Sequence, residues 1–311
     1  MIPGKDKDGL SALVVGIILI AAVVSGVMAF VPLEPFSSEK DWSYQGTTLL
    51  ESLDIATDAD VCDVEVAFAD LSEGWVEVSM SAEGRSGYMA GEPEINFTVT
   101  SILNGANLIV SVVLDMDTGP TVSYGESDIV VTIDRSLPTF LEIDVDVGDV
   151  VITVPANTSL TGAEVHTDVG GLHVHLDEGA KVLGDVDLRS DVGSVNVDCV
   201  NAMFADGVVV SAVTGTGSIY LDVEQSATPE GNLTFDCLAS VGSVHLSLMI
   251  EGDVAAEITS QANVGDLETE LVGFSGIDVH LESDNHPDVW NIDFLLEADV
   301  GSVNIEAEWR E

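Results

Sequence analysis

The sequence predicts an all-β protein, in which a parallel β-solenoid of about seven repeats follows a β-rich leading region and one N-terminal transmembrane helix. Three observations predict this fold. An Asp-Val-Gly tripeptide or a close variant recurs after residue 141, short alternating segments fill the chain from residue 58, and an uncharged apolar run precedes them. The predicted segments are a cytoplasmic tail (1–9), a transmembrane helix (10–33), a linker (34–57), the leading region (58–140) and the solenoid (141–311).

The apolar run from Leu10 to Leu33 is long enough to cross a bilayer, because about 20 helical residues span its hydrocarbon core. A cleaved secretory signal has a shorter apolar region of about 7 to 15 residues, although Ala29 offers a cleavage position. We therefore expect a single-pass anchor in the cell membrane. The C-terminal domain is then extracytoplasmic.

The same N-terminus supports an alternative function. Residues 7–11 (KDGLS), followed by the apolar run, resemble the signal of archaeal type IV pilin-like proteins. The resemblance implies cleavage after Gly9 and assembly of the apolar helix into a filament core. Pro32 and Pro35 depart from that pattern, because proline interrupts the hydrogen bonds of a helix.

The charge of the chain excludes one class of partner. It has 55 Asp and Glu residues against 8 Lys and Arg, which gives a net charge of -47. Nucleic acids are excluded because their recognition requires clustered cations. A hydrophobic fraction of 46% indicates a folded chain rather than a disordered one. A strongly acidic, lysine-poor surface is also typical of halophilic proteins, in which salt screens the self-repulsion.

Alternating segments predict strands in the leading region. Residues 61–66, 75–80 and 107–114 alternate apolar and polar side chains, and Gly, Asp, Asn or Ser bounds each of them. After the N-terminal run, no segment keeps a helical apolar period over three turns. We therefore expect almost no helix there.

The repeat is the strongest pattern in the sequence. Its glycines stand at positions 148, 170, 193, 217, 242, 265 and 301, so the spacings are 22, 23, 24, 25, 23 and 36 residues. When the copies are aligned on this glycine, apolar residues fall in columns before and after it, with polar residues between them. Each repeat thus predicts two short strands joined by a glycine turn. A unit of this size cannot bury its own apolar face and must stack on its neighbours.

Residues 128–138, followed by residues 141–148, resemble the start of the repeats in a family of adhesin-like proteins of otherwise unknown function. The resemblance covers residues 61–308. It implies a β-solenoid exposed on a cell envelope, with envelope or cell-surface components as partners and an adhesion-like or structural role. It brings no catalytic residues.

The only candidate metal site is a column of aspartates. Asp146, Asp168 and Asp191 each stand two residues before a repeat glycine, so stacking would bring like charges about 4.8 Å apart. Either these carboxylates accept hydrogen bonds from turn amides, or they bind a hard cation such as Ca²⁺ or Na⁺, with Asp149 as a further ligand. No other cofactor is expected.

Other motifs carry little chemistry. The triplet 117–119 (DTG) matches an aspartic-protease motif but has no second copy. The segment 115–126 has acids at three positions of a calcium loop, but Pro120 replaces the required glycine. His173 and His175, with His166 upstream, have a spacing compatible with zinc, but no further ligand is evident. We therefore expect no enzyme activity.

The cysteines and the glycosylation sequons are the remaining candidate sites of covalent modification. Three cysteines, Cys62, Cys199 and Cys237, are too few and too far apart in the repeat alignment for a disulfide framework, so buried free thiols are expected. Asn96, Asn157 and Asn232 stand in glycosylation sequons. Their modification would require export.

Overall fold

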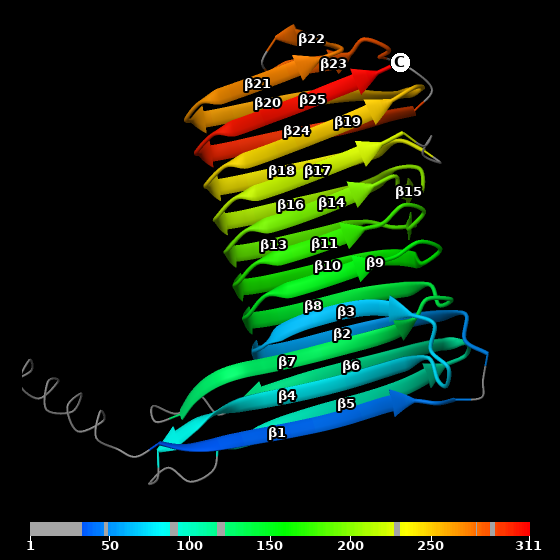
Figure 1. The fold of residues 1–311 in the computed structure, drawn as a ribbon, viewed down its shortest axis with the longest axis vertical. Helices are drawn as coiled ribbons and strands as arrows, with labels where there is room; N and C mark the ends of the chain where they lie inside the picture. The colour runs from blue at the N-terminus through cyan, green and yellow to red at the C-terminus, as the bar shows by residue number, and fades with distance from the viewer. Residues whose placement is uncertain are drawn as a thin grey trace, which may run out of the picture.

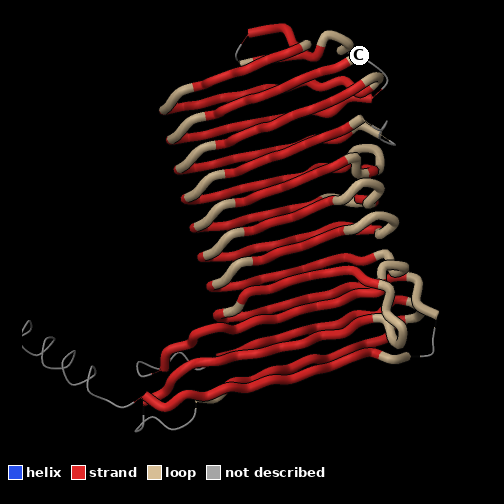
Figure 2. Tube along the Cα trace, in the orientation of Figure 1, coloured by secondary structure: helices blue, strands red, loops and turns tan. Residues whose placement is uncertain are grey.

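The computed structural model describes residues 33–46, 49–87, 93–116, 122–226, 231–277, 279–286 and 290–311. In these ranges every regular element is a β-strand, which confirms the all-β class. The strands form two large sheets that face each other along the molecule (Figure 1, Figure 2). The tail, Gly9 and the expected transmembrane segment before Leu33 lie outside the described residues. The described ranges contain no helix with the length and apolar character needed to cross a membrane.

The first sheet, called sheet A, has 11 strands. In pairing order they are β1 (Leu33–Tyr44), β4 (Val76–Gly87), β7 (Val122–Asp134), β3 (Asp63–Ala69), β9 (Val150–Val154), β11 (Leu172–Leu176), β14 (Val195–Val200), β17 (Ile219–Gln225), β19 (Val244–Glu251), β25 (Val303–Arg310) and β21 (Leu267–Val272). The pairs from β7 to β21 are parallel, whereas β1, β4 and β7 pair antiparallel.

The second sheet, called sheet B, has 14 strands. Its main path is β22 (Phe274–Ile277), β23 (His280–Ser283), β20 (Val254–Val264), β24 (Trp290–Val300), β18 (Leu233–Val241), β16 (Val208–Thr216), β13 (Val186–Val192), β10 (Ser159–Val169), β8 (Thr139–Val147), β2 (Ser52–Val61), β6 (Asn107–Met116) and β5 (Ile95–Asn104). Two short strands lie off this path: β12 (Lys181–Val182) pairs with β10, and β15 (Met203–Phe204) pairs with β12. The path is parallel from β20 to β6 and antiparallel at both ends.

The alternating sequence explains why the two sheets face each other. On β14, Val195, Val197 and Cys199 are buried, while the intervening Asn196 and Asp198 face outward. Successive side chains of a strand point to opposite sides, so every strand with this pattern gives one apolar and one polar face. The apolar faces of both sheets meet in one continuous core.

Glycine turns join the two sheets. One unit of the stack consists of a sheet B strand, a turn and a sheet A strand, for example β13, Gly193 and β14. The amide of Gly170 donates a hydrogen bond to the carbonyl of Val192 in the next unit. A Cβ on Gly170 would overlap the carbonyl oxygen of Gly148 in the preceding unit. The close approach of these backbones therefore requires glycine, and the turns line up along one edge of the stack (Figure 2).

The units stack in chain order only as far as Gly242. A Cβ on Gly301 would meet the carbonyl of Gly242, and one on Gly265 would meet that of Gly301. Strands β24 and β25 thus lie between the unit of β18 and β19 and the unit of β20 and β21 (Figure 1). The long spacing between Gly265 and Gly301 contains the hairpin of β22 and β23. This hairpin covers the free edge of β20.

The structure corrects the expectation of a linker at 34–57. Strand β1 and much of β2 occupy this segment, and Leu53 and Ile55 of β2 are buried. β2 and β3 form a further unit beneath β8 and β9, in which Cys62 takes the place of the glycine and donates its amide to Val147. The polar character of β1 concealed it, because an edge strand of an antiparallel sheet is largely solvated.

Candidate functional site

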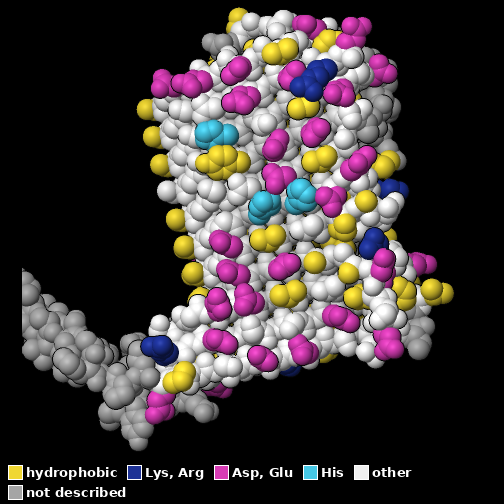
Figure 3. Space-filling model, viewed as in Figure 1, with side chains coloured by type: hydrophobic (Ala, Val, Ile, Leu, Met, Phe, Trp, Pro, Cys, Tyr) yellow, Lys and Arg dark blue, Asp and Glu magenta, His cyan; other side chains and the backbone are white. Residues whose placement is uncertain are grey.

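Among the described residues, histidines and carboxylates meet at three places on the sheets. The first is on sheet A, where His173 and His175 stand on β11 and Asp198 stands on the neighbouring β14. The residue between the histidines, Val174, is buried, so both histidines point outward. Asp198 is the parallel-register partner of His175. Nitrogen and oxygen atoms of the three side chains lie within 4.8 Å of one another, and Figure 3 shows histidines among acidic side chains on this face.

Two aspartates fix the geometry of this cluster. Nε2 of His173 lies 2.7 Å from Oδ2 of Asp198. Nδ1 of His175 lies 3.7 Å from the same oxygen. Nε2 of His175 lies 2.9 Å from Oδ1 of Asp177, which follows β11. The three side chains of the cluster are 36% to 45% exposed, so solvent screens their charges only in part.

The outer face of sheet A continues past this cluster with an aromatic stack. The ring of Tyr220 on β17 is parallel to that of His245 on β19, with centroids 4.8 Å apart. Nδ2 of Asn304 donates to Nδ1 of His245 over 3.2 Å, which places the ring proton of a neutral His245 on Nε2. These residues and Asp198, Asp222 and Glu306 line a hollow in the face. His245 is thus held by an aromatic ring and an amide.

The second cluster lies on sheet B and includes two of the aspartates that the sequence singled out. Nε2 of His166 lies 3.5 Å from Asp168 and 3.7 Å from Asp191. This nitrogen is buried and makes no hydrogen bond within the described residues. On the other side of the ring, Nδ1 lies 3.1 Å from Asp144. Arg189 also binds Asp191. The hydrogen bond from its guanidinium is the main reason that the pKa of the Asp191 carboxyl is below its ordinary value, and the charges of Arg189 and His166 act in the same direction.

Asp146 is in the same column but does not join this cluster. It is exposed, and the register of β8 with β10 places it opposite Asp168 of the next unit. Its pKa is raised by partial burial and by the surrounding charges of Asp60 and Asp168. The structure therefore groups Asp168 and Asp191 with His166 rather than with Asp146. Imidazole is a poor ligand for Ca²⁺, so this arrangement favours calcium less than the sequence pattern does.

Residues after the glycine cap the turns. Oδ1 of Asp149 accepts the amide of Gly171 over 2.6 Å, and Oδ1 of Asp63 accepts the amide of Asp149 over 2.8 Å. Buried hydroxyls provide a second set of bonds, such as the one from Ser190 to the carbonyl of Gly170 over 2.8 Å. Asp149 thus caps the turn by accepting a hydrogen bond from a backbone amide. The sequence pattern suggested this role for the aspartates that stand two residues before the glycine.

The third cluster is formed by the inserted hairpin. Glu257 on β20 pairs with Glu282 on β23, and His286 lies 3.7 Å from both carboxylates. The side chain of His286 is only 13% exposed. Asp293 on β24 lies beside Glu257, and burial together with the charge of Glu257 raises its pKa, whereas the charge of His286 lowers it. The histidine thus separates carboxylates that would otherwise repel one another.

The sequons and the loop motifs predicted from the sequence lie away from these clusters or outside the described residues. Asn96, Asn157 and Asn232 are all exposed, in β5, in the turn before β10 and just before β18. The triplet 117–119 and residues 117–121 of the calcium-like loop lie outside the described residues. These positions leave the sequon expectation open.

All three cysteines are buried and free. Cys199 lies on β14 of sheet A and Cys237 on β18 of sheet B. Burial raises the pKa of the Cys199 thiol to about 12 and raises that of Cys237 further. The thiols therefore remain protonated and act as small apolar side chains.

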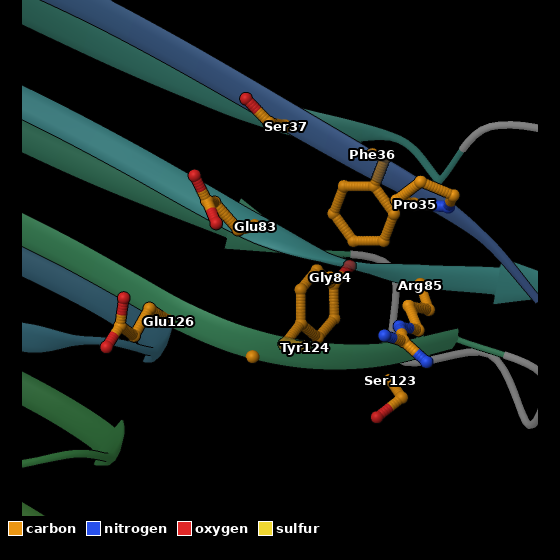
Figure 4. A pocket seen from close by; sticks show the side chains of 10 residues that line it. Pro35, Phe36, Ser37, Glu83, Gly84, Arg85, Ser123, Tyr124 and Glu126 are labelled. Atoms are coloured by element: carbon orange, nitrogen blue, oxygen red, sulfur yellow. The ribbon is translucent and has the colours of Figure 1, made fainter.

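A second hollow lies at the other end of the stack, between β1, β4 and β7 (Figure 4). The rings of Phe36 and Tyr124 meet there edge to face, with centroids 5.6 Å apart. The side chain of Arg85 lies beside this pair, with Glu83 and Glu126 further along the strands. It is one of the few cationic positions in a strongly acidic chain.

Sequence reasoning missed Asp198 as a partner of the paired histidines, although a signal was present. His175 stands five residues after Gly170, and Asp198 stands five residues after Gly193. Alignment on the glycine therefore places the two residues side by side. The Glu257, Glu282 and His286 cluster had no such signal, because the hairpin that forms it lies outside the repeat.

Comparison with known proteins gives a remote similarity. No family model and no curated protein sequence matches the chain. Among solved structures, the chain is similar to a candidate cell adhesion protein from Clostridium sporogenes, with a TM-score of 0.37 and 12% identity over 88% of this chain and 100% of that one. A candidate adhesin from Bacteroides fragilis has a TM-score of 0.32 and 16% identity, over 87% of this chain and 97% of that one. A candidate adhesin from Parabacteroides distasonis has a TM-score of 0.33 and 10% identity, over the same shares.

Proposed function

We propose that the chain is a membrane-anchored, extracytoplasmic β-solenoid of about seven repeats with an adhesion-like or structural role in the cell envelope. The parallel register of one unit on the next carries this proposal. Stacking of this kind extends the molecule in one direction and exposes a long, solvated face on each side. Such faces serve to present side chains at regular intervals to a large partner.

The N-terminal sequence supports the anchor. Strand β1 begins at Leu33, where the uncharged run ends, so the folded part follows the run directly. The large excess of acidic residues also lies after the run. A long acidic domain is readily accommodated outside the cytoplasm, because long domains translocate largely regardless of charge.

The role is binding rather than catalytic. The three thiols, which would be the strongest nucleophiles of the chain, are buried and held protonated. The hollow on sheet A is lined by carboxylates and amides together with the Tyr220 and His245 stack. This lining suits contact with a polar surface, such as envelope or cell-surface components.

Protease treatment of intact cells that express the full chain tests the topology. We expect loss of the acidic domain and protection of an N-terminal fragment that contains residues 10–33. Complete protection of the domain would overturn the proposed orientation. The mass of the mature chain separates the two functions considered: a chain that begins at Met1 supports the anchor, and one that begins at Leu10 supports the pilin-like filament subunit.

A further inference from the structure

We propose that His173, His175 and Asp198 bind one divalent transition-metal ion of the zinc type on the outer face of sheet A. The three residues come from two adjacent strands in the middle of the sheet, β11 and β14, each of which is paired on both sides. Sites on strands hold their ligands more precisely than sites on loops. The proposed ligand atoms are Nε2 of His173, Nδ1 of His175 and Oδ2 of Asp198.

The spacing of these atoms fits a shared ion. Ligands about 2.0 to 2.1 Å from a tetrahedral zinc are roughly 3.3 Å apart. The 3.7 Å between Nδ1 of His175 and Oδ2 of Asp198 is close to that value and too long for a hydrogen bond. The 2.7 Å between Nε2 of His173 and the same oxygen requires a small outward movement of one side chain. Half-exposed side chains permit such a movement, and solvent can supply the remaining ligand.

Asp177 prepares His175 for this role. Its Oδ1 lies 2.9 Å from Nε2 of His175, so a neutral His175 donates its proton there and leaves the lone pair on Nδ1. This nitrogen is the one that lies 3.7 Å from Oδ2 of Asp198. Metal-binding histidines commonly donate their second ring nitrogen to a carboxylate in this way.

The charge around the cluster favours a cation. Asp198 is the register partner of Asp222 on β17, so two carboxylates lie side by side on adjacent strands. Like charges in this position are destabilising, and a bound cation would relieve the repulsion. Two imidazoles select zinc, copper or nickel over calcium, because the hard cation prefers oxygen.

A simple pair of His–Asp contacts is the competing explanation. It accounts for the contact of His173 with Asp198 and that of His175 with Asp177, and it attributes the 3.7 Å approach of Nδ1 of His175 to Asp198 to the register of the two strands. The two explanations differ in their response to zinc.

The test is zinc titration of the full-length chain in detergent, by calorimetry, with excess Ca²⁺ present to occupy non-specific acidic sites. Cobalt binding, followed by its visible absorption, reports the nitrogen and oxygen ligands. We expect His175→Ala to lose one equivalent of bound zinc, and Asp177→Ala to bind that equivalent about 10 to 100 times more weakly. The matched control is His245→Ala on the same face, which should retain all of the bound zinc.

The His166 and His286 clusters also contain grouped potential zinc ligands, so the change in stoichiometry, rather than the total, decides. Equal zinc stoichiometry and affinity in the wild type and in His173→Ala/His175→Ala would overturn the proposal. So would an equal loss in His245→Ala. Circular dichroism establishes that each variant is folded, and His175→Gln, which preserves size and polarity, replaces His175→Ala if that variant does not fold.

Discussion

A Cβ atom added to Gly242 would overlap the carbonyl oxygen of Gly217, the glycine of the preceding unit. The backbone of Gly242 also has a φ of +149°, which side-chain-bearing residues rarely adopt. Both constraints arise from the contact between units. The repeat glycines are therefore required by the stacking rather than by the turn alone.

Gly242→Ala should lower the free energy of unfolding by about 2 to 4 kcal/mol, because the added methyl group separates two units. Gly252→Ala is the matched control, since Gly252 also has a positive φ but has no atom within 4 Å of the added Cβ. It should cost only about 1 kcal/mol. Denaturant unfolding measures both, and equal losses would argue against contact between the units.

Val195→Asp should lower the free energy of unfolding by several kcal/mol, on the order of 3 or more, because Val195 has no exposed surface and the charge would be unpaired. Val192→Asp is the matched control, because Val192 ends β13 at the same turn and is 49% exposed. It should change stability by about 0.5 kcal/mol. Thermal melting compares the two variants, and similar melting temperatures would refute the assignment of Val195 to the core.

The exchanged order of the last units predicts an unusual response to truncation. A chain that ends at residue 289 loses β24 and β25, which lie between the units on either side of them. Residues 252–286 should then become accessible to protease, while a chain that ends at residue 251 keeps a continuous stack. Limited proteolysis with mass spectrometry measures this. Protection of residues 252–286 in the longer truncation would contradict the exchanged order.

The buried thiols predict a loss of stability at high pH. The pKa of Cys199 is raised from its ordinary value of 9.0 to about 12, so between these values the folded state keeps a proton that the unfolded state releases. Stability from this group is therefore complete below pH 9 and decreases as the pH rises from 9 to 12. Cys199→Ala should flatten this part of the stability profile, measured by denaturation at several pH values. A parallel profile in the variant would count against the burial of the thiol.

The aspartate column predicts a dependence on salt. Asp146→Asn should raise stability by about 0.2 to 1 kcal/mol at low ionic strength, because it removes the repulsion by Asp60 and Asp168. Glu178→Gln, at an exposed turn position, is the control for a general charge effect. Melting temperatures at low and high NaCl measure the difference, which should disappear at high salt. If Ca²⁺ raises the melting temperature at constant ionic strength and Asp168→Asn abolishes that rise, the column is a cation site.

The sequence by itself determined the local structure of this protein. Alternation along residues such as Val195 to Cys199 specified strands and their buried side, because a strand presents successive side chains to opposite faces. The glycine spacing specified the turns, and with them the proximity of His175 to Asp198. Where a contact joins the same position of consecutive repeats, the sequence is sufficient to predict it.

Only the tertiary structure decided which units become neighbours when the spacing changes. The place of β24 and β25 between the unit of β18 and β19 and the unit of β20 and β21 depends on pairing between distant strands, and parallel pairing is compatible with either order. The same holds for β2 and β3, where Cys62 replaces the repeat glycine, and for Glu257 and His286, which an inserted hairpin brings together. Such contacts depend on which strand edge is free when the chain returns, and that edge is a property of the assembled sheets.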